Sequence, residues 1–114
     1  LWRCEKIQAK AARTGFEWPD ADAALDKVAE ETQELREAVA SGDADAVTEE
    51  LGDLLFAAVK VGRFAGIDPE EAVAGTCEKF IHRFRAVEDG AREQGRTLED
   101  MPLEEMTRLW NQAK

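Results

Sequence analysis

The spacing of the apolar residues constrains the fold of this chain more than any other feature. These residues recur every three or four positions along almost the whole sequence, and no alternating run bounded by turn residues competes with them. Such spacing places the apolar side chains on one face of an α-helix. We therefore predict an all-α fold, built as a bundle of about five helices.

Turn and capping residues divide this pattern into helices. Asp20 is a suitable N-cap for the second helix, and either Asp43 or Asp45 restarts the chain as the third. Asp68 followed by Pro69 marks the start of the fourth. No repeat or linker interrupts the series, so residues 1–114 are predicted to form one domain. The five helices are expected at about residues 2–13, 21–40, 44–66, 69–94 and 103–114.

Composition and charge exclude several classes of protein. Hydrophobic residues make up 44% of the chain and charged residues 35%, which is too apolar for a disordered chain. No window approaches the roughly 20 apolar residues of a membrane span. The 25 acidic and 15 basic residues give a net charge of −10, and most affinity for nucleic acid comes from basic residues. We expect a soluble protein with neither nucleic acid nor membrane as a partner.

The remaining sequence signals concern location and cofactor type. Cys4 and Cys77 are the only cysteines and no leader-like segment precedes the domain, so a reducing, cytoplasmic location is expected. The single His82 argues against a zinc site built from several His and Cys residues. Neither a P-loop nor a dinucleotide-binding glycine motif is present. The chain opens with Leu1 rather than Met, as expected of a piece of a longer protein.

Two acidic pairs stand at a spacing of three residues on consecutive predicted helices. The second helix carries Glu31 and Glu34, and the third carries Glu50 and Asp53 directly before its apolar stretch at 54–65. Residues three apart lie on one face of a helix. Because a short turn makes these helices antiparallel neighbours, the four carboxylates can meet in one groove.

The apolar residues of the same two helices predict where these acids point. In the second helix Glu31 projects about 60° from the centre of the apolar sector, given 100° per residue. The third helix is apolar nearly all round over 54–65, which predicts that it is buried. One chain offers too few partners to cover it, so we predict a homodimer. The expected apolar sector of the second helix comprises Ala24, Leu25, Val28, Leu35 and Val39.

A cluster of four carboxylates is unfavourable unless a cation lies among them, because the charges repel one another and lose hydration. Mg²⁺, with Mn²⁺ as a substitute, takes oxygen ligands and keeps positions open for water and phosphate oxygens. We therefore predict a magnesium site. The alternative interpretation is a solvated face, the usual role of acidic residues in a charged helical protein.

Basic residues on the fourth helix allow two interpretations. Lys79 and Arg83 lie one turn apart, beside an apolar row. They either extend along this surface and pair with Glu78 and Glu71, or supply positive charge to a metal-bound triphosphate. The apolar row comprises Val73, Cys77, Phe80, Phe84 and Val87.

Aromatic residues are equally open to two interpretations. Trp110 lies among the apolar residues of the last helix, where it either packs in the core or stacks on a base. Trp18 and Arg13, on either side of the first loop, are weaker candidates of the same kind. His82 projects away from the apolar row and is expected to be exposed.

Three segments resemble the catalytic domain of the MazG family of nucleoside triphosphate pyrophosphohydrolases. They are DKVAEETQEL at 26–35, TEELGDLLFAAVKVGR at 48–63 and EKFIHRF at 78–84, followed by Trp110 near the end. The similarity spans nearly the whole chain. It is strongest to the C-terminal copy of members that carry two such domains.

The resemblance implies a shared all-α dimer that hydrolyses nucleoside triphosphates to monophosphate and pyrophosphate. Glu31, Glu34, Glu50 and Asp53 match the magnesium ligands of the family. One carboxylate that is not fully used as a ligand can take the proton from water, and both Glu34 and Glu50 are candidates.

Further residues match the substrate-binding positions of the family. Lys79 and Arg83 match a basic pair that contacts the phosphates, and Lys27 matches a basic residue beside the first acidic pair. Trp110 matches an aromatic residue near the base. All four acidic positions are retained, so the resemblance predicts an active enzyme.

Two rival functions differ from this enzyme in the residues or partners that they require. A di-iron carboxylate bundle needs two Glu-x-x-His motifs. The chain has one His, four residues after Glu78, which excludes this interpretation. A helical dimerisation or regulatory domain that binds nucleotide beside an active partner domain remains open, and an assay of the products from a nucleotide panel with Mg²⁺ separates it from the enzyme.

Overall fold

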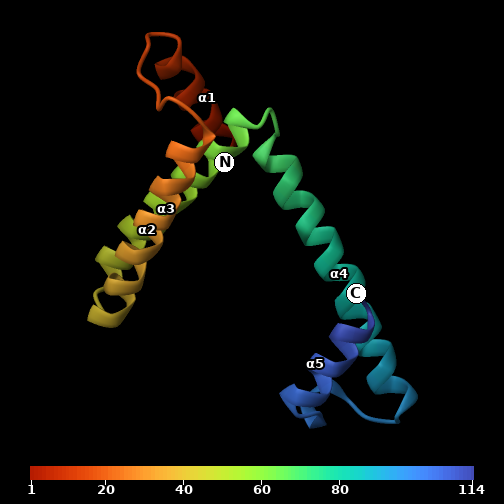
Figure 1. Ribbon diagram of the computed structural model, residues 1–114. Helices are drawn as coiled ribbons and strands as arrows, with labels where there is room; N and C mark the ends of the chain where they lie inside the picture. Colours follow the sequence, from red (N-terminus) through yellow and green to blue (C-terminus); the bar gives the residue numbers. More distant parts are fainter. The chain divides into compact units, whose positions relative to one another are not determined.

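The computed structural model describes residues 1–114 and confirms the all-α prediction. It contains five α-helices, one short 3₁₀ turn and no strand, and the helix ends lie within two residues of the expected positions. Figure 1 shows the order of these elements along the chain. They are α1 (Trp2–Ala12), α2 (Ala21–Ser41), α3 (Ala44–Phe64), α4 (Pro69–Glu93), η1 (Leu98–Asp100) and α5 (Leu103–Gln112).

Local capping explains the sharp boundaries of α2 and α3. The side chain of Asp20 accepts a hydrogen bond from the backbone amide of Ala23. Gly42 then ends α2 in the left-handed conformation, with φ at 74°, which favours glycine. The next residue, Asp43, accepts from two backbone amides of the first turn of α3. Of the two candidates for this cap, Asp43 is therefore the correct one.

The chain divides into two compact units, which comprise residues 1–72 and 73–114. In the first unit, α2 and α3 lie side by side as a hairpin, and α1 contacts α3 (Figure 1). Gln8 of α1 is buried and donates from its side-chain amide to the backbone carbonyl of Phe56, 2.8 Å away. The prediction of one domain over residues 1–114 stays a prediction.

The buried face of α2 differs from the predicted apolar sector. Leu25 and Val39 are 49% and 61% exposed, whereas Ala24, Glu31 and Ala38 are buried. These three positions are seven residues apart, two helical turns, so one narrow strip of the helix faces α3. Small alanines allow the two backbones to approach closely. Whether a residue of α2 is buried depends more on its distance from α3 than on its own hydrophobicity. The prediction, which used hydrophobicity alone, therefore included Leu25 and Val39 wrongly.

The predicted burial of α3 is not found in this single chain. Leu51, Leu55 and Phe56 are each more than a third exposed, and only Ala57 and Val59 are buried. The physical reason is that α1 and α2 cover only part of the helix circumference. No helix combines the length and the apolar composition that a membrane crossing requires.

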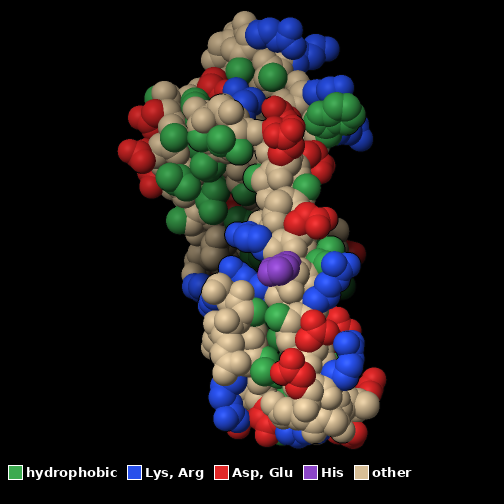
Figure 2. Space-filling view, turned by 90° about the vertical axis from the view of Figure 1, so that its right-hand side faces the viewer, with side chains coloured by type: hydrophobic (Ala, Val, Ile, Leu, Met, Phe, Trp, Pro, Cys, Tyr) green, Lys and Arg blue, Asp and Glu red, His purple; other side chains and the backbone are tan.

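In the second unit, α4 and α5 are held together by a small core that includes Val87, Ala91 and Met101. Gly90 permits close packing, because a Cβ there would lie 2.7 Å from a methyl of Leu109. Four residues of the apolar row on α4 are exposed and only Val87 is buried, so most of this row is not covered in this chain. His82 is exposed on α4, as predicted (Figure 2).

Candidate functional site

Three of the predicted acidic residues come together between α2 and α3. Glu31 of α2 and both Glu50 and Asp53 of α3 each offer one carboxylate oxygen, and these atoms all lie within 4.8 Å of one another. Oxygen ligands at about 2.1 Å from one Mg²⁺ are at most about 4.2 Å apart. A slight contraction of the cluster would therefore let one ion contact all three carboxylates.

The hydrogen bonds of these acids show whether the cluster has carboxylate oxygens left for a cation. The side chain of Glu31 is only 5% exposed, and its one ion-pair partner is Lys27, whose Nζ lies 3.0 Å from Oε1. The other oxygen, Oε2, is buried without a hydrogen-bond partner, and so is Oε2 of Glu50. Burying an unpaired carboxylate oxygen is costly. Two such oxygens in a hard, all-oxygen donor set fit a divalent cation.

Glu34, the fourth predicted ligand, is not among the three acids whose oxygens come together, but it interacts with two of them. Hydrogen bonds to Glu31 and then to Glu50, together with the repulsion of both charges, raise the pKa of Glu34 to about 7. The pKa of Glu31 is lowered, mainly by the hydrogen bond from Lys27, which outweighs the opposite effect of desolvation. In the metal-free protein, Glu34 is therefore about half protonated at pH 7, whereas the lowered pKa of Glu31 keeps it ionised.

Lys27 lies beside the first acidic pair, where the sequence predicted a basic residue. Its Nζ is 3.3 Å from Glu30 and 3.0 Å from Glu31. Hydrogen bonds to these two carboxylates raise the pKa of Lys27. The ammonium thus offsets part of the negative charge at the edge of the cluster.

A second group of charged residues in this unit escaped the sequence analysis. Glu17, in the loop after α1, pairs with Arg63 of α3 and lies 3.6 Å from Nζ of Lys60. Burial raises the pKa of Glu17, but hydrogen bonds from Arg63 and from the backbone amide of Trp18 outweigh this and lower it. The signal in the sequence was the presence of Lys60 and Arg63 within the otherwise apolar stretch 54–65.

Aromatic residues connect these two groups. Trp18 lies under Lys60, with Nζ 4.2 Å from the centroid of its ring. Residues of both groups line one pocket of about 310 Å³: Phe16, Trp18, Lys27, Glu31, Asp53, Phe56, Ala57 and Lys60. Arg13, the other weak candidate of the first loop, is exposed.

The predicted basic pair and Trp110 belong to the second unit and form a group of their own. The guanidinium of Arg83 lies 5.7 Å from the centroid of the Trp110 ring. Lys79 is exposed, and neither basic residue forms an ion pair, so the pairing with Glu78 and Glu71 that the sequence left open is not found.

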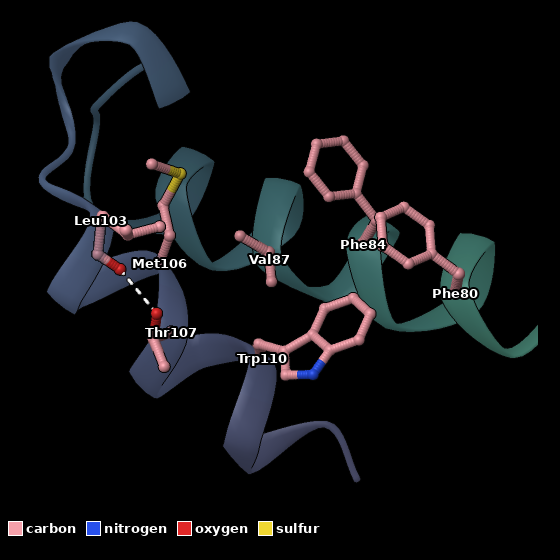
Figure 3. A pocket seen from close by; sticks show the side chains of 7 residues that line it. All are labelled: Phe80, Phe84, Val87, Leu103, Met106, Thr107 and Trp110. Atoms are coloured by element: carbon pink, nitrogen blue, oxygen red, sulfur yellow. Dashed lines mark hydrogen bonds between the residues drawn. The ribbon is translucent and has the colours of Figure 1, made fainter. Parts of the chain in front are cut away.

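Trp110 borders an apolar pocket between α4 and α5. Its ring is tilted against that of Phe80, with centroids 5.1 Å apart. Figure 3 shows Trp110 facing Phe80, Phe84 and Val87 across this pocket, which has a volume of about 220 Å³. Trp110 is half-buried, so it packs on α4 and still presents part of its ring.

Comparison with known proteins agrees with the resemblance found in the sequence. The MazG nucleotide pyrophosphohydrolase domain matches residues 20–87. The chain is 38% identical over 114 residues to the nucleoside triphosphate pyrophosphohydrolase/pyrophosphatase MazG of Thermotoga maritima, and 40% identical over 118 aligned residues to a nucleoside triphosphate pyrophosphohydrolase of Escherichia coli. Each match covers 100% of this chain but only 44% of the relative.

A further relative is matched over a shorter segment. The chain is 54% identical over 65 residues to the protein YabN of Bacillus subtilis, a segment that covers 57% of this chain and 13% of YabN. The chain thus spans less than half the length of these relatives.

Proposed function

The chain belongs to the MazG nucleotide pyrophosphohydrolase family, and from this premise we propose that it hydrolyses nucleoside triphosphates to nucleoside monophosphates and pyrophosphate. The names of the relatives from Thermotoga maritima and Escherichia coli support this activity. The observation that carries the proposal is the group of three carboxylate oxygens within 4.8 Å, two of whose residues also bury an unpaired oxygen.

We propose Mg²⁺ as the metal ion, with Mn²⁺ as a substitute. Glu31, Glu50 and Asp53 would hold it, and Glu34 would join them after losing its proton. When bound, the ion neutralises phosphate charge and lowers the pKa of water.

The other roles fall to side chains of this chain. Glu34 or Glu50 accepts the proton of the attacking water. Lys79 and Arg83 stabilise the negative charge that develops on the phosphates, and their lack of ion-pair partners leaves their donors available. Lys27 holds Glu31 in its ionised form at the cluster. Trp110 offers an aromatic face to the nucleotide.

A homodimer in the cytoplasm is part of the proposal. Leu51 and Leu55 of α3 are 44% and 46% exposed, as is most of the apolar row on α4. Large apolar residues exposed in this number favour a partner surface. A second copy of the chain would bury them.

A nucleotide panel tests the proposed reaction. The protein is incubated with ribo- and deoxyribonucleoside triphosphates in Mg²⁺ or in EDTA, and the products are separated by anion exchange. We expect monophosphate and pyrophosphate in Mg²⁺ only. Glu50→Gln should abolish turnover, whereas the control Glu49→Gln, which changes the exposed neighbour on the same helix, should retain it.

Two results would contradict the proposal. Nucleoside diphosphate and phosphate as products would mean a different bond is cleaved. Nucleotide binding without any turnover would instead support the regulatory domain that the sequence left open.

A further inference from the structure

The pocket beside the carboxylate cluster has two chemically different ends. Glu31, Asp53 and Lys27 line one end, where the proposed metal and phosphates would lie. Aromatic rings of Phe16 and Trp18 line the other, in the loop between α1 and α2. Its volume of about 310 Å³ falls at the lower end of the range for small-molecule pockets, about 300–1,000 Å³. The whole pocket is built by the first unit.

Lys60 lies at the aromatic end without a hydrogen bond of normal length. Its side chain is only 12% exposed, and Nζ lies 4.2 Å from the Trp18 ring centroid and 5.9 Å from that of Phe56. The nearest carboxylate oxygen, Oε1 of Glu17, is 3.6 Å away, beyond a normal hydrogen bond. That oxygen already accepts from the backbone amide of Trp18. The partners of this largely buried ammonium are therefore one long ion pair and the faces of two aromatic rings, and its three N–H donors make no hydrogen bond of normal length.

We infer that Lys60 determines base specificity: it donates a hydrogen bond to an exocyclic oxygen of a base stacked against Phe16 and Trp18. This inference rests on the proposed function, because it assumes a nucleotide in the pocket. The substrate class it names is nucleotides with an oxygen at purine C6 or pyrimidine C4. An amino group at the same position, as in adenine or cytosine, would meet Lys60 donor to donor and form no hydrogen bond with it.

The surroundings of Lys60 favour a base over a phosphate as its partner. Three aromatic rings, those of Phe16, Trp18 and Phe56, line this end of the pocket. The flat face of a base can stack on these rings, whereas a phosphate would lose hydration among them.

Inosine and adenosine nucleotides test the inference, since hypoxanthine and adenine share the purine frame and differ around C6. The values of kcat/KM for ITP and ATP are compared in the wild type and in Lys60→Met. We expect the wild type to prefer ITP about tenfold, as one charge-assisted hydrogen bond allows, and the variant to lose this preference. Lys60→Gln should lose it too, because an amide can present either an oxygen or an N–H to the base.

Lys6→Met is the matched control. Lys6 lies over the ring of Trp2 at 4.4 Å in the same kind of contact, but it does not line this pocket. The ratio of kcat/KM for ITP to kcat/KM for ATP should stay at the wild-type value in this variant. Thermal unfolding of all three variants shows which of them fold.

Calorimetric binding of the monophosphates IMP and AMP separates this inference from the proposed reaction, because it requires neither hydrolysis nor a triphosphate. IMP should bind more tightly than AMP to the wild type and equally with AMP to Lys60→Met. Equal dissociation constants for IMP and AMP in the wild type, or no binding of either monophosphate, would overturn the inference. An equal loss of kcat/KM for ITP and ATP in Lys60→Met would assign Lys60 to the phosphates and overturn it as well. Absence of all hydrolysis, with selective IMP binding retained, would overturn only the reaction.

Discussion

Replacing Glu34 with Gln removes the one carboxyl group of the metal-free cluster that is expected to release a proton when a metal ion binds. Hydrogen bonds to Glu31 and Glu50, and the repulsion of their charges, raise the pKa of Glu34 to about 7. A cation bound among these carboxylates would displace this proton, because metal ligands bind in their deprotonated form. Metal binding and proton release are therefore coupled in the wild type. Gln keeps the hydrogen-bond donor but has no proton to release in this pH range.

The magnitude follows from the pKa. With a pKa of about 7, Glu34 is about 90% protonated at pH 6 and about 10% protonated at pH 8. Mg²⁺ binding should thus release about 0.9 proton at pH 6 and about 0.1 at pH 8 from this group. Glu34→Gln should release almost none from this position at either pH.

Titration calorimetry measures this release when Mg²⁺ is added in buffers of different ionisation enthalpy. Glu37→Gln is the control, because Glu37 is an exposed carboxylate on the same helix, away from the cluster. Equal proton release in the wild type and Glu34→Gln would refute the reasoning. So would the absence of release from the wild type at pH 6.

The same pKa predicts how stability depends on pH in EDTA. A pKa raised on folding contributes stability that is fully present below the unfolded value of 4.5 and is lost as pH rises through about 7. The melting temperature of the wild type should therefore fall between pH 6 and pH 8 by more than that of Glu34→Gln. A parallel fall in both proteins would contradict the shift.

Three further predictions concern the cluster, the basic pair and the oligomer. Asp53→Asn and Glu50→Gln should raise the melting temperature in EDTA while abolishing hydrolysis and reducing the stabilisation by Mg²⁺; lower melting temperatures would mean that the cluster is not strained. Lys79→Ala and Arg83→Ala should each lower kcat/KM about tenfold or more with little change in the melting temperature. Unchanged kinetics would mean that both residues belong to a solvated face without a role in turnover. Sedimentation should give a homodimer, and a stable monomer at micromolar concentration would exclude it.

The sequence alone determined the local features of this protein. Helix boundaries depend on residues close in the chain: Asp20 and Asp43 cap their helices by bonding amides two or three residues away. The placement of Glu50 and Asp53 on one face also follows from helix geometry alone, because a spacing of three residues fixes it. The resemblance to the MazG family also follows from short stretches of sequence, such as the EELGDLLF segment at 49–56.

Only the tertiary structure decided which face of each helix is buried and which distant residues meet. Leu25 is exposed and Glu31 is buried because the line of contact with α3 runs along the small alanines of α2, which helical periodicity cannot reveal. The pairing of Glu17 with Lys60 and Arg63 joins the first loop to α3 across more than 40 positions of the chain. Such contacts depend on how helices pack, and packing is set by the shapes of both surfaces together rather than by either sequence segment.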